Sequence, residues 1–159
     1  QLDWGLRNDP RVTVREGVNA RDLGPGDAGA PPPSLVVADL AFISLAKVLP
    51  ALRRAAPEAE LVVLVKPQFE VGRERVGRGG VVRDPAAWLD ALHGVARSLE
   101  SLGCAVRGAC ASPITGPAGN HEFFLHAVPA PDARPVEDAA LEAAVAEAQA
   151  PSGAARRLE

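Results

Sequence analysis

The sequence of 159 residues contains no methionine, no tyrosine and two cysteines, and its net charge is only −3. Cys104 and Cys110 lack a CxxC spacing and nearby histidines, so we expect reduced core thiols in a cytoplasmic protein rather than a zinc site. No apolar run approaches the roughly 20 residues that span a bilayer, so no membrane partner is expected. The absence of GxGxxG disfavours a nicotinamide enzyme. Without an initiator methionine, we expect chain upstream of Gln1 to be missing.

Lysine is also scarce, since 15 of the 17 basic residues are arginines and only Lys47 and Lys66 are lysines. Lys66 directly follows the apolar run Leu61–Val65, which predicts a strand buried on both faces. Pro67 then prevents regular strand pairing. A desolvated lysine can give up its proton, whereas arginine cannot, so Lys66 is a candidate general base. The alternative is a strand-end charge that reaches water.

Strand and helix patterns alternate along the chain, which predicts one α/β domain with a parallel sheet that ends in a strand pair. A Gly- and Arg-rich loop is predicted over 69–83. The alanine-rich stretch 136–149 is helix-prone but has a thin apolar stripe, so we expect a weakly docked or mobile tail. Strands are predicted over 12–16, 35–39, 61–65, 105–112 and 122–128, and helices over 45–56 and 84–102.

Two carboxylates are predicted to lie beside Lys66. Asp39 ends one buried strand and Lys66 ends the next, and a right-handed crossover would bring both to the same sheet edge. If the last strand runs antiparallel, Glu122 at its start joins them. Such a cluster could orient and deprotonate an alcohol. The alternatives are a helix-proximal cap for Asp39 and an exposed strand acid for Glu122.

Three motifs resemble the TlyA family of FtsJ-like, S-adenosylmethionine-dependent ribosomal RNA 2′-O-methyltransferases, also labelled hemolysin A. They are Asp39–Leu45, Leu64–Gly72 and Gly116–Leu125. The shorter stretches 9–12 and 16–21 fit the same pattern. The resemblance covers residues 1–128, which we interpret as a partial methyltransferase domain, and residues 129–159 as a Pro/Ala-rich tail, helix-prone or disordered.

The resemblance implies a class I, Rossmann-like methyltransferase sheet that modifies a cytidine 2′-hydroxyl. Asp39, Lys66 and Glu122 would be catalytic, together with a first lysine upstream of Gln1. Glu16 would bind the ribose of S-adenosylmethionine and Asn19 its adenosine end, with Asp39 also at the cofactor. The resemblance further implies an upstream RNA-binding domain of the S4 type, a glycine-rich cofactor loop and a central strand between the Glu16 and Asp39 strands, none of which this sequence contains.

The long loop carries four arginines, Arg73, Arg75, Arg78 and Arg83, which we expect to contact phosphates of ribosomal RNA. The alternative is a solvated, mobile connection. Two other functions stay open at this point. The chain could be a non-catalytic fragment that serves as an interaction module, or a membrane-active cytolysin, which the lack of a basic amphipathic helix disfavours.

Overall fold

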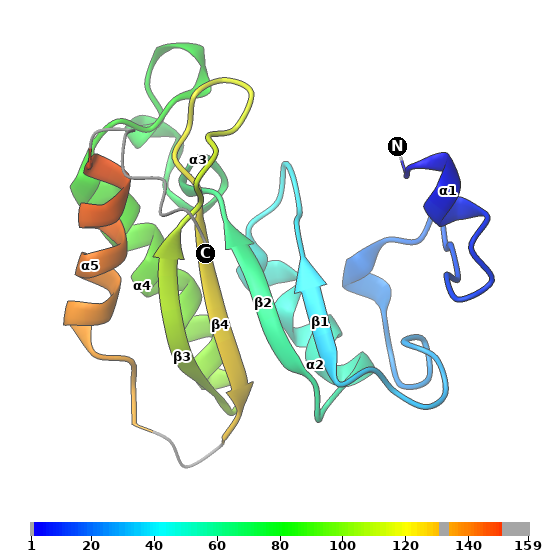
Figure 1. Cartoon of the computed structure of the whole chain (residues 1–159). Coiled ribbons are helices and arrows are strands. Elements are labelled where there is room, and N and C mark those ends of the chain that lie inside the picture. The colour runs from blue at the N-terminus through cyan, green and yellow to red at the C-terminus, as the bar shows by residue number, and fades with distance from the viewer. Residues whose placement is uncertain (1, 131–133, 151–159) are drawn as a thin grey trace, which may run out of the picture.

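Four strands form one sheet in the order β1-β2-β4-β3, and helices α2 and α4 pack behind it (Figure 1). The structure is a computed structural model that describes residues 2–130 and 134–150. The strands are β1 (Leu35–Ala38), β2 (Glu60–Val65), β3 (Cys104–Ala111) and β4 (Phe123–Pro129). The α-helices are α1 (Trp4–Arg7), α2 (Leu49–Ala55), α3 (Pro67–Glu70), α4 (Pro85–Ser101) and α5 (Asp138–Gln149), and the 3-10 turns are η1 (Ala20–Asp22), η2 (Leu45–Lys47), η3 (Arg73–Arg75) and η4 (Arg78–Gly80).

The sheet is mixed, as the sequence predicted. β1 and β2 are parallel, whereas β4 runs antiparallel to both β2 and β3. The register pairs Val65 with Phe123, so the carboxyl end of β2 lies beside the start of β4. This topology places the ends of β1 and β2 and the beginning of β4 at one edge.

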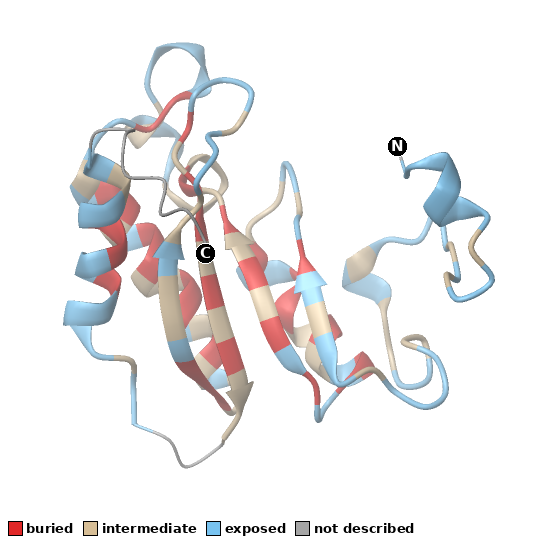
Figure 2. Cartoon of the chain, viewed as in Figure 1, coloured by how far each residue is buried: buried red, intermediate tan, exposed pale blue. Residues whose placement is uncertain are grey.

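β2 forms where the apolar run predicted it, but the expectation that both its faces are buried is wrong. Leu61, Val63 and Val65 are fully buried in the core that also holds the apolar residues of α2 and α4. Val62 and Leu64 point to the other face and are only half-buried, which gives the alternating stripes of Figure 2. Burial depends on which elements cover each face, and the composition of a single strand does not specify that.

The helix predicted over 84–102 is confirmed as α4. The Asp84 side chain accepts a hydrogen bond from the Ala86 N–H at 3.0 Å and caps the helix, and Pro85 occupies its first turn. Gly103 follows with a φ of 72°, a left-handed conformation that glycine adopts without strain.

The helix predicted over 45–56 is instead divided into η2 and α2. Pro50 lies in the first turn of α2. Its ring nitrogen cannot donate to the preceding turn, so one continuous α-helix cannot run through it. Ser44 still caps the start of η2, through the Ala46 N–H at 3.3 Å.

The predicted strand over 12–16 is wrong. No strand lies there in the described part of the chain, and these residues pair with no other strand. A β-branched, alternating segment becomes a strand only where a partner completes its hydrogen bonds.

The stretch over 136–149 does form a helix, α5, but the expectation of weak docking is wrong for it. Leu141, Ala144 and Val145 are buried in the common core, and α5 packs beside β3 and α4 (Figure 1). The Glu147 carboxylate accepts a hydrogen bond from the Ala111 N–H of β3 at 2.9 Å. Residues 131–133 and 151–159 of the predicted tail lie outside the described residues.

Among residues 2–130 and 134–150, no helix is long and apolar enough to cross a bilayer.

Candidate active site

Three charged side chains meet at the edge where β1 and β2 end and β4 begins. Asp39 directly follows β1, Lys66 directly follows β2, and Glu122 directly precedes β4. Because Val65 pairs with Phe123, the next residues outward, Lys66 and Glu122, face each other across the two strands. The predicted juxtaposition of these three residues is therefore confirmed.

Lys66 and Asp39 form a close ion pair. The Lys66 Nζ lies 2.6 Å from Oδ1 of Asp39. The lysine side chain is 15% exposed and the aspartate side chain 67% exposed. The Lys66 amine is thus largely shielded from solvent, whereas the Asp39 carboxylate that contacts it is accessible to a ligand.

Glu122 is the most enclosed member of this cluster, with 8% of its surface exposed. Burial raises the pKa of its carboxyl group, while the Lys66 charge opposes that rise and the Asp39 charge adds to it. Gly116 lies directly against this carboxylate, since a Cβ on Gly116 would come within 2.7 Å of Oε1. A glycine at this position therefore makes room for the acid.

A third carboxylate, Glu70, connects the turns that follow β1 and β2. Its Oε2 accepts from the Ser44 hydroxyl at 2.6 Å, and its Oε1 accepts from the Leu45 N–H at 2.8 Å. Burial raises its pKa, and these two hydrogen bonds oppose that rise. Because Glu70 ends α3, which begins directly after Lys66, it ties the lysine turn to the Asp39 turn.

A cavity of about 540 Å³, a volume within the usual range for small-molecule sites, is lined by residues 41–44 of the turn that follows Asp39, whereas Asp39, Lys66 and Glu122 themselves do not line it. Phe42 and Phe69 line it, with ring centroids 5.4 Å apart. Phe42 is 92% exposed, and its φ of 62° is rare for a residue with a side chain. Asn19, the N-cap residue of η1, lies in the wall together with two basic residues, Arg21 and Lys47.

The two residues expected at the cofactor occupy different places. Asn19 lines this cavity, and its Oδ1 accepts from the Arg21 N–H at 3.1 Å. Glu16 lies outside the cavity lining, is exposed, and pairs with Arg7. The structure thus brings Asn19, but not Glu16, to the cavity that residues 41–44 also line.

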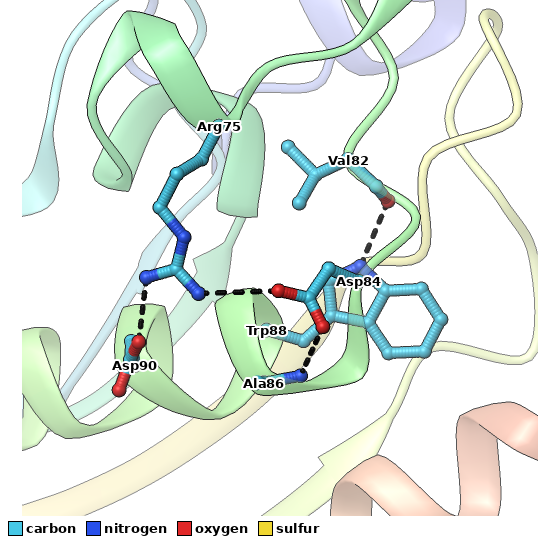
Figure 3. A network of polar contacts seen from close by, with 6 residues as sticks. All are labelled: Arg75, Val82, Asp84, Ala86, Trp88 and Asp90. Atoms are coloured by element: carbon cyan, nitrogen blue, oxygen red, sulfur yellow. Dashed lines mark hydrogen bonds and ion pairs between the residues drawn. The ribbon is translucent and has the colours of Figure 1, made fainter.

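The arginine-rich loop divides into two kinds of side chain. Arg75 is held against α4 by Asp90 at 2.5 Å and Asp84 at 3.4 Å (Figure 3). Its guanidinium is committed to these carboxylates, which makes it a structural anchor rather than a free phosphate ligand. The other three loop arginines are exposed and form no ion pair with other described residues: Arg73, Arg78 and Arg83.

Sequence reasoning did not single out Glu70, Gly116 or Asn120. All three lie within the motifs that carried the resemblance, but their partners lie elsewhere in the chain. Only the fold shows that Glu70 reaches Ser44, that Gly116 touches Glu122 and that Asn120 bonds residues 80 and 82.

The fold is that of a methyltransferase family. The FtsJ-like methyltransferase family model matches residues 1–128, and the chain belongs to this family.

Relatives with known names agree with the family. The chain is 56% identical over 126 residues to the 16S/23S rRNA (cytidine-2′-O)-methyltransferase TlyA of Mycobacterium tuberculosis, covering 79% of this chain and 47% of that protein. It is 35% identical over 127 residues to Hemolysin A of Brachyspira hyodysenteriae, covering 79% and 53%. A solved structure from Streptococcus thermophilus, described as a "putative hemolysin", superposes with a TM-score of 0.88 at 37% identity, covering 94% of this chain and 54% of that one. The chain thus spans about half the length of the curated relatives named here.

Proposed function

We propose that this chain carries the catalytic edge of an S-adenosylmethionine-dependent methyltransferase that modifies a cytidine 2′-hydroxyl of ribosomal RNA. The observation that carries the proposal is the cluster of Lys66, Asp39 and Glu122 at the sheet edge, with Nζ and Oδ1 2.6 Å apart. The relatives described above support the choice of RNA as substrate.

The roles follow from the placement of each group. Lys66, as the neutral amine, would take the proton of the 2′-hydroxyl, and the oxygen would then form its new bond to the methyl group. Asp39 would orient the lysine through the contact between Nζ and Oδ1, and its exposed carboxylate can also accept a hydrogen bond from the ribose. Glu122 lies across the strand pair from Lys66 and would hold the amine from the other side. S-adenosylmethionine, when bound, would supply the methyl group from its sulfonium, whose S–CH3 bond breaks as the O–CH3 bond forms and leaves a neutral thioether.

The cavity lined by Asn19 and Phe42 fits the adenosine end of this cofactor. It is large enough for a nucleoside, it begins two residues after Asp39, and it offers an aromatic wall with a polar amide beside it. We keep Glu16 as a proposed ribose ligand, which would require its release from Arg7.

The decisive variant is Lys66→Arg in the natural full-length protein. Arginine keeps the positive charge and the partner Asp39 but cannot serve as a base. Methyl transfer to ribosomal RNA should fall by about 10²- to 10⁴-fold, the usual contribution of a general base. Arg97→Lys, at an exposed position of α4, controls for the exchange of the two cations. Near-normal turnover by a folded Lys66→Arg protein would rule out the base role.

The partner proposed for the loop is the RNA backbone, through Arg73, Arg78 and Arg83. Replacing all three by glutamine should weaken RNA binding and reduce the slope of log affinity against log salt by about 2 to 3, at about 0.7 to 0.9 per lost phosphate contact. An unchanged slope would remove the loop from the interface. We further propose cytoplasmic localisation, no membrane partner, and an S4-type RNA-binding domain elsewhere in the natural protein.

A further inference from the structure

Asn120 is buried between two loops that are distant in sequence. Only 3% of its surface is exposed. Its Oδ1 accepts from the Val82 N–H at 3.0 Å, and its Nδ2 donates to the Gly80 carbonyl at 2.9 Å. One amide therefore satisfies a donor and an acceptor of the arginine-rich loop at once, as a neighbouring strand would do.

The same residue shapes the loop that carries Glu122. The Asn120 carbonyl accepts from the Gly116 N–H at 2.9 Å, and Gly116 in turn lies against the Glu122 carboxylate. The Glu122 carbonyl accepts from the Ser112 N–H at 2.8 Å and closes the base of this loop. The position of Glu122 thus depends on the turn over residues 116–120, which the buried side-chain amide of Asn120 holds in place.

The opposite side of this contact is anchored on α4. The Trp88 Nε1 donates to the Val82 carbonyl at 2.8 Å (Figure 3), so both polar groups of the Val82 peptide are bonded. The centroids of the Trp88 and His121 rings also lie 4.8 Å apart. His121 is the residue between Asn120 and Glu122 in the sequence. Asn120 is therefore bonded to residues 80–82, a segment that Trp88 of α4 holds in place.

We propose that Asn120 is a positioning residue for catalysis: it fixes Glu122 opposite Lys66 by bonding the Glu122 loop to residues 80–82. This inference rests on the proposed methyl transfer. Asn120 does not touch the Lys66–Asp39 pair, so its loss should loosen the acid while it leaves the cofactor cavity intact.

The test is Asn120→Ala in the natural full-length protein. We expect kcat for methyl transfer to fall about 10- to 100-fold, while KM for RNA and Kd for S-adenosylmethionine change less than about threefold. The matched control is Glu100→Ala, which removes a side-chain acceptor of the Val136 N–H at 2.8 Å, at the other end of α4 from Asp84. The control should keep kcat within about threefold of wild type.

A second measurement, amide hydrogen exchange, needs no activity. In Asn120→Ala the Gly116 and Ser112 amides should exchange faster than in wild type, whereas Glu100→Ala should leave them unchanged. Unchanged exchange, an unchanged kcat in an active protein, or parallel losses of kcat, KM and Kd would each overturn the positioning role. A wild-type protein that transfers no methyl group to RNA would instead refute the proposed function, and the exchange data would still decide whether Asn120 holds the loop.

Discussion

Replacement of Gly116 by alanine tests how closely Glu122 must be held. The new Cβ would lie 2.7 Å from Oε1 of Glu122 and 3.4 Å from its Cδ. Carbon-to-oxygen contacts of this kind normally measure about 3.3 to 3.6 Å, so the carboxylate must retreat by about 0.6 to 0.9 Å. A displacement of about 1 Å at a catalytic group can cost about 10²-fold in rate, so we expect kcat to fall between about 10- and 100-fold.

The same substitution should leave the fold intact. The crowded atoms belong to the end of a flexible side chain, and the nearest backbone atom, the Asn120 carbonyl oxygen, is 3.8 Å away. Gly116 is not among the glycines with a positive φ, so alanine can adopt its backbone conformation. Where that holds, glycine-to-alanine changes typically stabilise by about 0.4 to 1 kcal/mol, because they restrict the unfolded chain.

The assay compares Gly116→Ala with Gly94→Ala in the natural full-length protein. A Cβ on Gly94, in α4, would meet no atom within 4 Å. This control should gain about 0.5 to 1 kcal/mol in stability, as expected for alanine in a helix interior, and should keep full turnover. Both proteins are followed by thermal unfolding and by methyl transfer at saturating substrate. A folded Gly116→Ala protein with wild-type kcat would refute the claim that the Glu122 carboxylate must lie where the structure places it.

Two further predictions concern stability. Because burial raises the pKa of Glu122 in the folded protein, its charged form costs stability; this cost is absent below the ordinary glutamate pKa of about 4.3 and grows as pH rises through the raised value. Glu122→Gln should therefore unfold at higher urea concentration than wild type at pH 7.5 but at the same concentration near pH 4, and a less stable variant at pH 7.5 would contradict this sign. Leu141→Ala in α5 removes a fully buried side chain and should cost about 2 to 5 kcal/mol, against little for the half-exposed Leu6→Ala; equal effects in denaturant unfolding would mean that α5 is not part of the folded unit.

The charged edge formed by Asp39, Lys66 and Glu122 was predictable, because its geometry follows from rules that act along the chain. Asp39 and Lys66 each end an apolar run, and a β-helix-β crossover leaves little choice about where those ends lie. Glu122 required one further assumption, an antiparallel last strand, which the register confirms. Residues at the ends of strands can thus be placed relative to one another from a single sequence.

The contacts around that edge were not predictable, because they join side chains to groups of residues that are distant in the sequence. Glu70 bonds residues 25 and 26 positions earlier, and Asn120 bonds residues 38 and 40 positions earlier. No period or local propensity encodes such a pairing. The failed strand over 12–16 has a related cause, since β-propensity describes a segment but supplies no partner for its hydrogen bonds.

Strand register and the hydrogen bonds between distant residues contribute differently to the geometry of the site. Strand register places Asp39, Lys66 and Glu122 near one another, but each of the acids sits at the margin of a loop whose course the sheet does not determine. Glu70 fixes the turn after Asp39, through Ser44 and Leu45, and Asn120 fixes the loop before Glu122. Catalytic geometry is commonly needed to within about 0.5 Å, which neighbouring strands alone do not guarantee. We therefore expect substitutions at these two buried polar residues to impair methyl transfer while the sheet itself remains folded.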